Sequence, residues 1–164
     1  MLGWGFPPNV SGGLDTVVGE LHDAYADRDD VALTLVLPDE YAPADVPNVQ
    51  GVPTGSGDVI TRIGRLADAF VDAAEDADVV HTHDWFGHTP GARAQATHDV
   101  QWVSTFHSLS ADRNLNPPAR ELDTEQRIVD RADRLVAVSN LTARRTAEQY
   151  GTEPAVVHNG FKRV

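Results

Sequence analysis

The sequence contains no cysteine and a single lysine, and both absences exclude classes of site. Without cysteine the chain has no disulfide, no thiolate metal ligand and no cysteine nucleophile. Lys162 is the only lysine among 13 basic residues, whereas aspartate supplies 18 of the 25 acidic residues. The net charge of -12 argues against nucleic acid or an anionic membrane as a partner, because both select basic patches. This acidity predicts a salt-adapted, halophilic protein.

Long hydrophobic runs are also absent. No stretch approaches the roughly 20 apolar residues that a membrane-spanning helix needs, and the N-terminus lacks the basic-then-apolar pattern of a signal peptide. A cytoplasmic protein without a transmembrane segment is therefore the expectation. The 164 residues, of which 41% are hydrophobic, suit one domain, residues 1–164, that can bury a core.

Apolar runs alternate along the chain with amphipathic stretches of helical period, which is typical of a parallel sheet between helices. We therefore expect an α/β fold with three layers, a Rossmann-like parallel sheet with helices on both faces. If residues 49–52 form the third strand, after a short first strand at 1–4, the sheet order begins 3-2-1-4. The other strands are expected at 31–37, 79–82, 102–106, 135–138 and 155–157, and the helices at 13–27, 60–74, 89–98, 121–132 and 140–150.

Small, polar or aromatic clusters follow several of these strands. In open α/β sheets ligands bind outside the carboxyl ends of the strands, so the sequence predicts one shared crevice. The clusters are Gly12-Gly13-Leu14, His83-Asp84-Trp85-Phe86-Gly87, Phe106-His107-Ser108 and His158-Asn159-Gly160.

The Gly12-Gly13 pair lies between a strand and a helix. Glycine lets a ligand approach the backbone closely, and the free N–H groups of a helix start suit phosphate or sugar hydroxyls. A turn that merely needs glycine is the structural alternative. The spacing of the glycines does not match the G-x-G-x-x-G dinucleotide fingerprint, which disfavours a nicotinamide-dependent oxidoreductase.

Residues 81–85 alternate across a strand, so His81 and His83 should face one way and Thr82 and Asp84 the other. A metal site here would need further ligands such as His88 or Asp84, and no known metal motif is present, so we expect no metal. The favoured interpretation makes Asp84 and Trp85 a carbohydrate contact, with a carboxylate for hydroxyls and an aromatic face for C–H surface. Ordinary packing of Trp85 under a loop is the other interpretation.

His107 ends an apolar strand and precedes Ser108. Either its ring forms hydrogen bonds with backbone groups, or it donates a hydrogen bond to a sugar or leaving-group oxygen. The second role is possible because imidazole can donate or accept a proton near neutral pH. Glu125 lies on a helix, where it either faces solvent or reaches into the crevice.

Taken in order, these motifs resemble the N-terminal domain of family 4 glycosyltransferases, which include glycogen synthases, sucrose synthases and many mannosyltransferases. The resemblance covers essentially the whole chain. It rests on Trp4-Gly5-Phe6-Pro7-Pro8, Ser11-Gly12-Gly13-Leu14, His81-Thr82-His83-Asp84-Trp85, Thr105-Phe106-His107-Ser108, Ala132-Asp133 with Val138-Ser139, Tyr150-Gly151 and His158-Asn159-Gly160. Relatives commonly have Glu and Gly where Gly5 and Asp15 stand here.

The resemblance implies one half of a GT-B fold, in which two Rossmann-like domains enclose a nucleotide-sugar donor, with the C-terminal nucleotide-binding domain absent from this chain. It implies a retaining glycosyltransferase with a hydroxyl acceptor and no cofactor. By motif match the catalytic candidates are His107 and Asp84, and the substrate-binding candidates are Gly12, Gly13, Trp85, Ser108 and Glu125. We expect the chain alone to be inactive. The alternative is a non-catalytic carbohydrate-binding fragment, or a half that pairs with a separate C-terminal chain.

Overall fold

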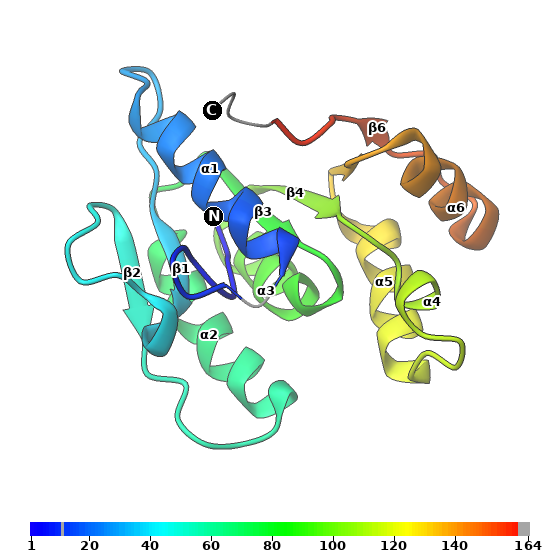
Figure 1. Cartoon of the computed structure of the whole chain (residues 1–164), viewed down its shortest axis with the longest axis horizontal. Helices are drawn as coiled ribbons and strands as arrows, with labels where there is room; N and C mark the ends of the chain where they lie inside the picture. The colour runs from blue at the N-terminus through cyan, green and yellow to red at the C-terminus, as the bar shows by residue number, and fades with distance from the viewer. Residues whose placement is uncertain (11, 161–164) are drawn as a thin grey trace.

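The structure, a computed structural model, describes residues 1–10 and 12–160; Ser11 and Lys162 lie outside the described residues. Strands and helices alternate along the chain (Figure 1). The strands are β1 (Leu35–Pro38), β2 (Val49–Val52), β3 (Val79–His83), β4 (Gln101–Phe106), β5 (Arg134–Ala137) and β6 (Ala155–Val156). The helices are α1 (Gly13–Ala26), α2 (Val59–Ala73), α3 (His88–His98), α4 (Ser110–Arg113), α5 (Ala119–Arg131) and α6 (Asn140–Tyr150), with short 3-10 turns η1 (Asp39–Tyr41) and η2 (Trp85–Gly87).

All paired strands are parallel, in the order β1-β2 and β3-β4-β5-β6. Leu2 joins the two groups. It forms a parallel bridge with Val36, and its N–H donates to the His81 carbonyl oxygen at 2.9 Å. The first residues therefore lie between β1 and β3, which confirms the predicted 3-2-1-4 order. Leu2 is completely buried, so this short central segment is held by the core as well as by hydrogen bonds.

The second predicted strand is shorter than expected, because β1 begins at Leu35 and not at residue 31. Its partner β2 has only four residues, and the register sets Leu35 against Val49 and Pro38 against Val52. A ladder cannot extend beyond the strand with which it pairs. The apolar run at 31–34 therefore has no strand neighbour to continue it.

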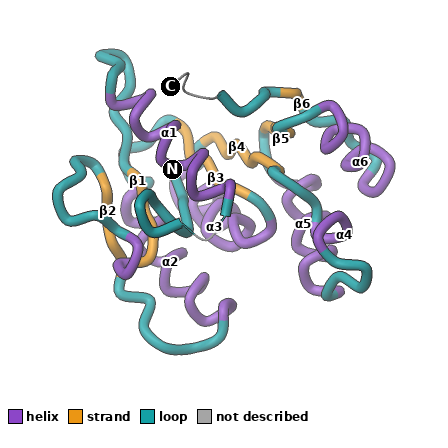
Figure 2. The backbone as a smooth tube through the Cα atoms, viewed as in Figure 1, coloured by secondary structure: helices purple, strands orange, loops and turns teal. Residues whose placement is uncertain are grey.

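Helices lie on both sides of the strands (Figure 2). Alternate residues of the central strands face these two helical layers. Helix α3 contacts both α2 and α5 on one face, where the fully buried Trp102 of β4 packs against Gly91 of α3. Helix α1 lies across the opposite face, where Val18 packs with Leu35. The predicted three-layer α/β architecture is confirmed. It directs His81 and His83 towards α1, and Thr82 towards Trp102, whose Nε1–H donates to its hydroxyl at 2.9 Å.

The helix ends follow the chemistry expected from the sequence. The Asp58 carboxylate accepts a hydrogen bond from the Thr61 N–H at 2.8 Å, and the Ser139 hydroxyl accepts one from the Thr142 N–H at 3.0 Å. Gly151 ends α6 with φ 74°, a conformation that glycine adopts without strain. In the described part of the chain, no helix is both long and apolar enough to cross a membrane.

Candidate functional site

Asp84 joins the ends of two neighbouring strands. Its N–H donates to the Thr105 carbonyl oxygen at 2.9 Å, and its Oδ1 accepts from the His107 N–H at 2.8 Å. Its backbone has φ 48° and ψ -170°, a region that a non-glycine residue occupies at a cost on the order of 1–3 kcal/mol. Strain of this kind is tolerated where the surroundings fix the residue. The ends of β3 and β4 are therefore held in one defined arrangement.

The Asp84 carboxylate is enclosed by protein, and this burial raises its pKa from 3.8 to about 6. The hydrogen bond from the His107 N–H and the positive charge of Arg113 act in the opposite direction. An Arg113 nitrogen lies 3.5 Å from Asp84 Oδ2. A carboxyl whose pKa is near 6 exchanges its proton close to neutral pH, a property that suits acid-base chemistry as well as hydroxyl recognition.

A cavity of about 290 Å³ brings together two of the four predicted clusters, because Gly12, Asp84 and Trp85 all line it. His107 and the His158-Asn159-Gly160 cluster line a different cavity, so the single shared crevice that the sequence predicts is divided into two. Their roles in binding stay predictions. Of the lining residues within 1–10 and 12–160, Arg113 is the only basic one; the others include Trp4, Leu14, Asp15, Val59 and Phe86.

The glycine pair is not required by the conformation or the packing of this domain. Gly12 has φ -174°, which is extended backbone open to any residue, and Gly13 is the first residue of α1. A Cβ added at either position meets no atom within 4 Å. A turn that needs glycine is therefore not the explanation for this pair. What remains is an open surface against which a ligand can approach the backbone closely.

Gly5 and Asp15, the two departures from the common family pattern, lie in direct contact. Asp15 Oδ1 accepts a hydrogen bond from the Gly5 N–H at 3.0 Å, and a Cβ at Gly5 would overlap the Asp15 carboxylate. The expected family pattern has a carboxylate at position 5 and a glycine at position 15. In this chain the two residue types are exchanged between these two contacting positions. Asp15 is 2% exposed and directs its Oδ1 to backbone.

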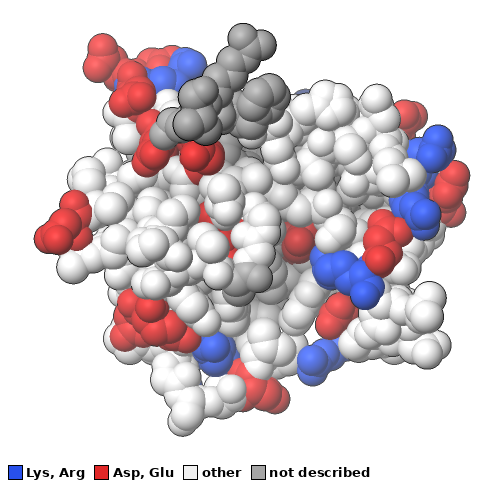
Figure 3. All heavy atoms as spheres, in the orientation of Figure 1, with Lys and Arg blue, Asp and Glu red and all other residues white. Residues whose placement is uncertain are grey.

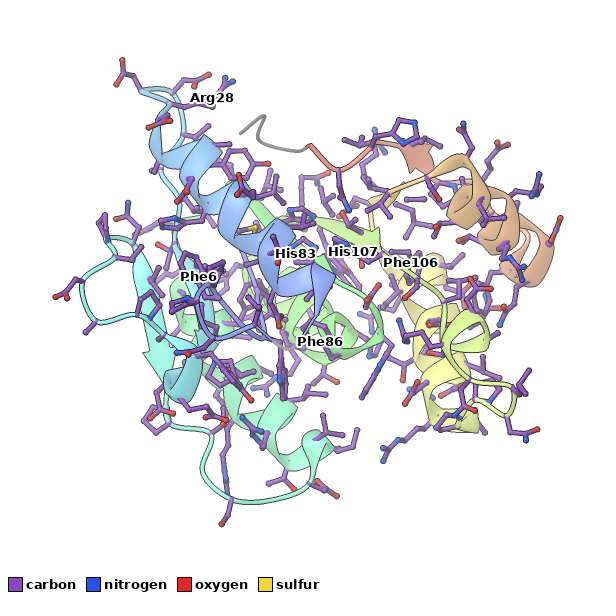
Figure 4. The ribbon with its side chains drawn as sticks, in the orientation of Figure 1. Phe6, Arg28, His83, Phe86, Phe106 and His107 are labelled. Carbon is purple, nitrogen blue, oxygen red and sulfur yellow. The ribbon has the colours of Figure 1, made fainter. Side chains whose placement is uncertain are left out.

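The histidines lie on the face of the sheet below α1. His81 Nε2 is 2.8 Å from the Thr105 hydroxyl, and His83 Nδ1 is 3.1 Å from His107 Nε2 (Figure 4). All three rings line a second cavity of about 530 Å³ with mainly apolar walls, formed by α1, the strands and residues 157–160. The His107 side chain thus faces this larger cavity, while its backbone N–H belongs to the Asp84 contact.

Ser108 and Glu125 do not line the smaller cavity but lie beside Arg113, which does. Arg113 donates to the Ser108 carbonyl and hydroxyl oxygens, each at 2.8 Å. Glu125 is completely buried: its Oε1 accepts from the Ser110 N–H and hydroxyl at 2.7 Å, and its Oε2 accepts from the Tyr150 hydroxyl. Glu125 therefore supports α4 from below and does not face solvent. Its predicted contact with substrate stays a prediction.

Arg113 is a site residue that the sequence did not reveal. It lies between the expected strand at 102–106 and the expected helix at 121–132, where the sequence predicts no element. The structure places it on a one-turn helix, α4, with a guanidinium nitrogen 3.5 Å from Asp84 Oδ2. Among 12 arginines no spacing distinguished it. The available signal was its position six residues after His107, within reach of the same strand end.

A metal site at the histidines lacks converging ligands. His88 packs against Trp102 on the other face of the sheet, with ring centroids 6.2 Å apart. In the described residues, no group of three or more His, Asp and Glu side chains is arranged to hold a metal ion.

Charge is unevenly distributed around the site. On the face shown in Figure 3, acidic side chains cluster around α1 and β2, whereas over α4, α5 and α6 basic side chains are interspersed with acidic ones. Arg113 lies on α4 and lines the small cavity. Its guanidinium is the group there that can attract an anion.

The fold and the site define an α/β domain whose ligand groups gather at the carboxyl ends of parallel strands. The chain belongs to Glycosyltransferase Family 4, whose family model matches residues 11–162. It is a domain of the GT-B type, in agreement with the resemblance drawn from the sequence.

Characterised relatives agree with this assignment. The D-inositol 3-phosphate glycosyltransferases of Mycobacterium tuberculosis and Mycobacterium bovis are 36% identical over 94 residues, which cover 51% of this chain and 19% of theirs. Two structures of the sucrose-phosphate synthase from Thermosynechococcus elongatus share the fold, with TM-scores of 0.75 and 0.58 at 16% and 18% identity. The first match covers 94% of this chain and 45% of the synthase. The match thus covers less than half the length of the glycosyltransferases and of the first synthase structure, and 78% of the second.

The histidine cluster predicts a loss of stability in acid. Burial lowers the pKa of His81 and His107 from 6.5 to about 4, and it lowers that of His83 well below 6.5. Between these values the unfolded chain binds more protons than the folded chain, so the free energy of unfolding should fall as the pH falls from about 6.5 to about 4. The raised pKa of Asp84 increases the free energy of unfolding as the pH falls below about 6, but this is one group against three histidines.

Urea unfolding at fixed ionic strength, from about pH 7 to about pH 4.5, measures this dependence. His81→Gln should make it shallower and Asp84→Asn steeper. A midpoint that stays constant or rises on acidification would contradict the account.

Proposed function

We propose that this chain is the acceptor-side, N-terminal domain of a retaining glycosyltransferase. In this proposal the complete enzyme moves a sugar from a nucleotide-sugar donor to a hydroxyl acceptor without a cofactor. The observation that carries it is the meeting of Gly12, Asp84, Trp85 and Arg113 around one small cavity. Retention of the anomeric configuration is taken from the family resemblance.

Each group has a role that follows from its chemistry. The Gly12-Gly13 backbone, free of Cβ atoms and at the start of α1, approaches the donor phosphates. The Asp84 carboxyl accepts a hydrogen bond from an acceptor hydroxyl, and the half-buried Trp85 covers the apolar face of the sugar ring. His107 follows β4, the strand next to β3, and its side chain faces the larger cavity, where it contacts the transferred sugar.

Arg113 gives the proposal a more specific acceptor class. Among the described residues that line the cavity it is the only basic one, and a guanidinium recognises phosphate oxygens in a fork geometry. Relatives at 36% identity are named as glycosyltransferases of D-inositol 3-phosphate. We therefore propose an acceptor that carries both ring hydroxyls and a phosphate, with Arg113 as the phosphate contact.

Calorimetric titration of the chain with inositol 3-phosphate tests the acceptor assignment. Arg113→Gln should weaken binding about tenfold or more, because a hydrogen bond to a charged group contributes roughly 1.5–3 kcal/mol. The control is Arg93→Gln. Arg93 lies on α3 and does not line the cavity; its guanidinium pairs with the Asp68 carboxylate at 2.7 Å. Equal affinities for the wild-type chain and Arg113→Gln would contradict the assignment, as would the absence of binding.

The chain alone should not transfer sugar, because half of the proposed donor cleft comes from a second domain. Incubation with labelled nucleotide sugars and inositol 3-phosphate, in the salt that the acidic composition predicts it needs, measures this. Clear turnover would show that the second half is dispensable. If a separately produced C-terminal half restores transfer, the chain acts as one half of a split enzyme. If inositol 3-phosphate binds but no second half restores transfer, the non-catalytic alternative is favoured.

A further inference from the structure

One hydrogen bond links the rings of His83 and His107. The His83 Nδ1 and His107 Nε2 atoms are 3.1 Å apart, and the ring centroids are 5.2 Å apart (Figure 4). A hydrogen bond between two imidazole nitrogens needs a proton on one and a lone pair on the other. The contact therefore has two possible arrangements, which differ in which ring donates.

The remaining nitrogens of the two rings have different surroundings. His83 is completely buried, and its Nε2 is enclosed without a hydrogen-bond partner among the described residues. His107 is only partly buried and lines the larger cavity, and its Nδ1 forms no hydrogen bond to the described part of the chain. One ring therefore ends in a sealed atom and the other in an accessible one.

Both rings are neutral at physiological pH, because burial lowers the pKa of His107 to about 4 and that of His83 well below its ordinary value. A neutral imidazole carries one proton on one of its two nitrogens. The ring that donates within the pair must therefore leave its other nitrogen bare, and the ring that accepts must carry its proton on its other nitrogen.

The two arrangements differ in what they bury. If His107 donated, His83 would hold its proton on the sealed Nε2, as an N–H enclosed without an acceptor. If His83 donates, its sealed Nε2 carries only a lone pair, and His107 carries its proton on the accessible Nδ1. Orphaned buried N–H groups are rarer in proteins than under-satisfied acceptors, so the second arrangement is the favoured one.

We propose that His83 is a positioning residue: its Nδ1–H donates to His107 Nε2 and holds His107 in the tautomer that presents Nδ1–H outward. The use of that N–H rests on the proposed function, in which it donates to a hydroxyl or leaving-group oxygen of the sugar. Without His83, His107 would be free to adopt the Nε2–H tautomer, which an unconstrained neutral histidine side chain prefers and which turns a bare Nδ1 outward.

Long-range proton–nitrogen NMR spectra of the ¹⁵N-labelled chain at neutral pH report the tautomer directly. We expect His107 to show a protonated Nδ1 and a bare Nε2, and His83 to show the same pattern. The signals are assigned by their loss in His107→Asn and His83→Asn. A protonated Nε2 on His107 in the wild-type chain would overturn the proposal.

Two substitutions at His83 separate positioning from packing. His83→Leu removes the donor and should shift His107 to the Nε2–H pattern. His83→Asn places an amide nitrogen on Cγ, where Nδ1 stood, and should retain the Nδ1–H pattern. An unchanged tautomer in His83→Leu would overturn the proposal; if His83→Leu does not fold, the wild-type and His83→Asn spectra still decide.

The tautomer and the proposed function fail separately. If the Nδ1–H pattern is present but inositol 3-phosphate does not bind, the function falls and the positioning role of His83 stands. If the phosphate binds but His107 shows the Nε2–H pattern, the positioning role falls alone.

Discussion

The contact between the Asp84 carboxylate and the His107 N–H is the constraint on which the site depends. It fixes the end of β3 to the end of β4, and it holds Asp84 in a backbone conformation that costs free energy. The same carboxylate lies beside Arg113, whose helix α4 is supported by the buried Glu125. The ends of β3 and β4 and helix α4 are thus positioned by one chain of polar contacts.

The parallel sheet explains why two cavities of different character adjoin. Residues that alternate along β3 and β4 face α1 on one side and α3 on the other, so the histidines line the large apolar cavity. Beyond the strand ends the alternation stops, and Asp84 and Trp85 turn towards the glycine loop. His107 connects the two, with its ring in one cavity and its backbone bound to Asp84.

Local patterns were sufficient to predict the strand order, the helix caps and the meeting of Gly12 with Asp84 and Trp85. These features depend on alternation, on capping residues and on the general geometry of parallel sheets. Arg113, the burial of Glu125 and the pairing of His83 with His107 were not predicted. They depend on how α4, α5 and α6 pack over the strand ends, and a short polar segment such as residues 110–113 carries no periodic signal for that packing.

A crystal structure of the chain with inositol 3-phosphate bound is the most direct test of the central claim. The account predicts the phosphate at the Arg113 guanidinium, with the ring between Asp84 and Trp85 and close to Gly12. Inositol 3-phosphate bound in the larger cavity below α1, or away from the strand ends, would contradict this placement of the acceptor.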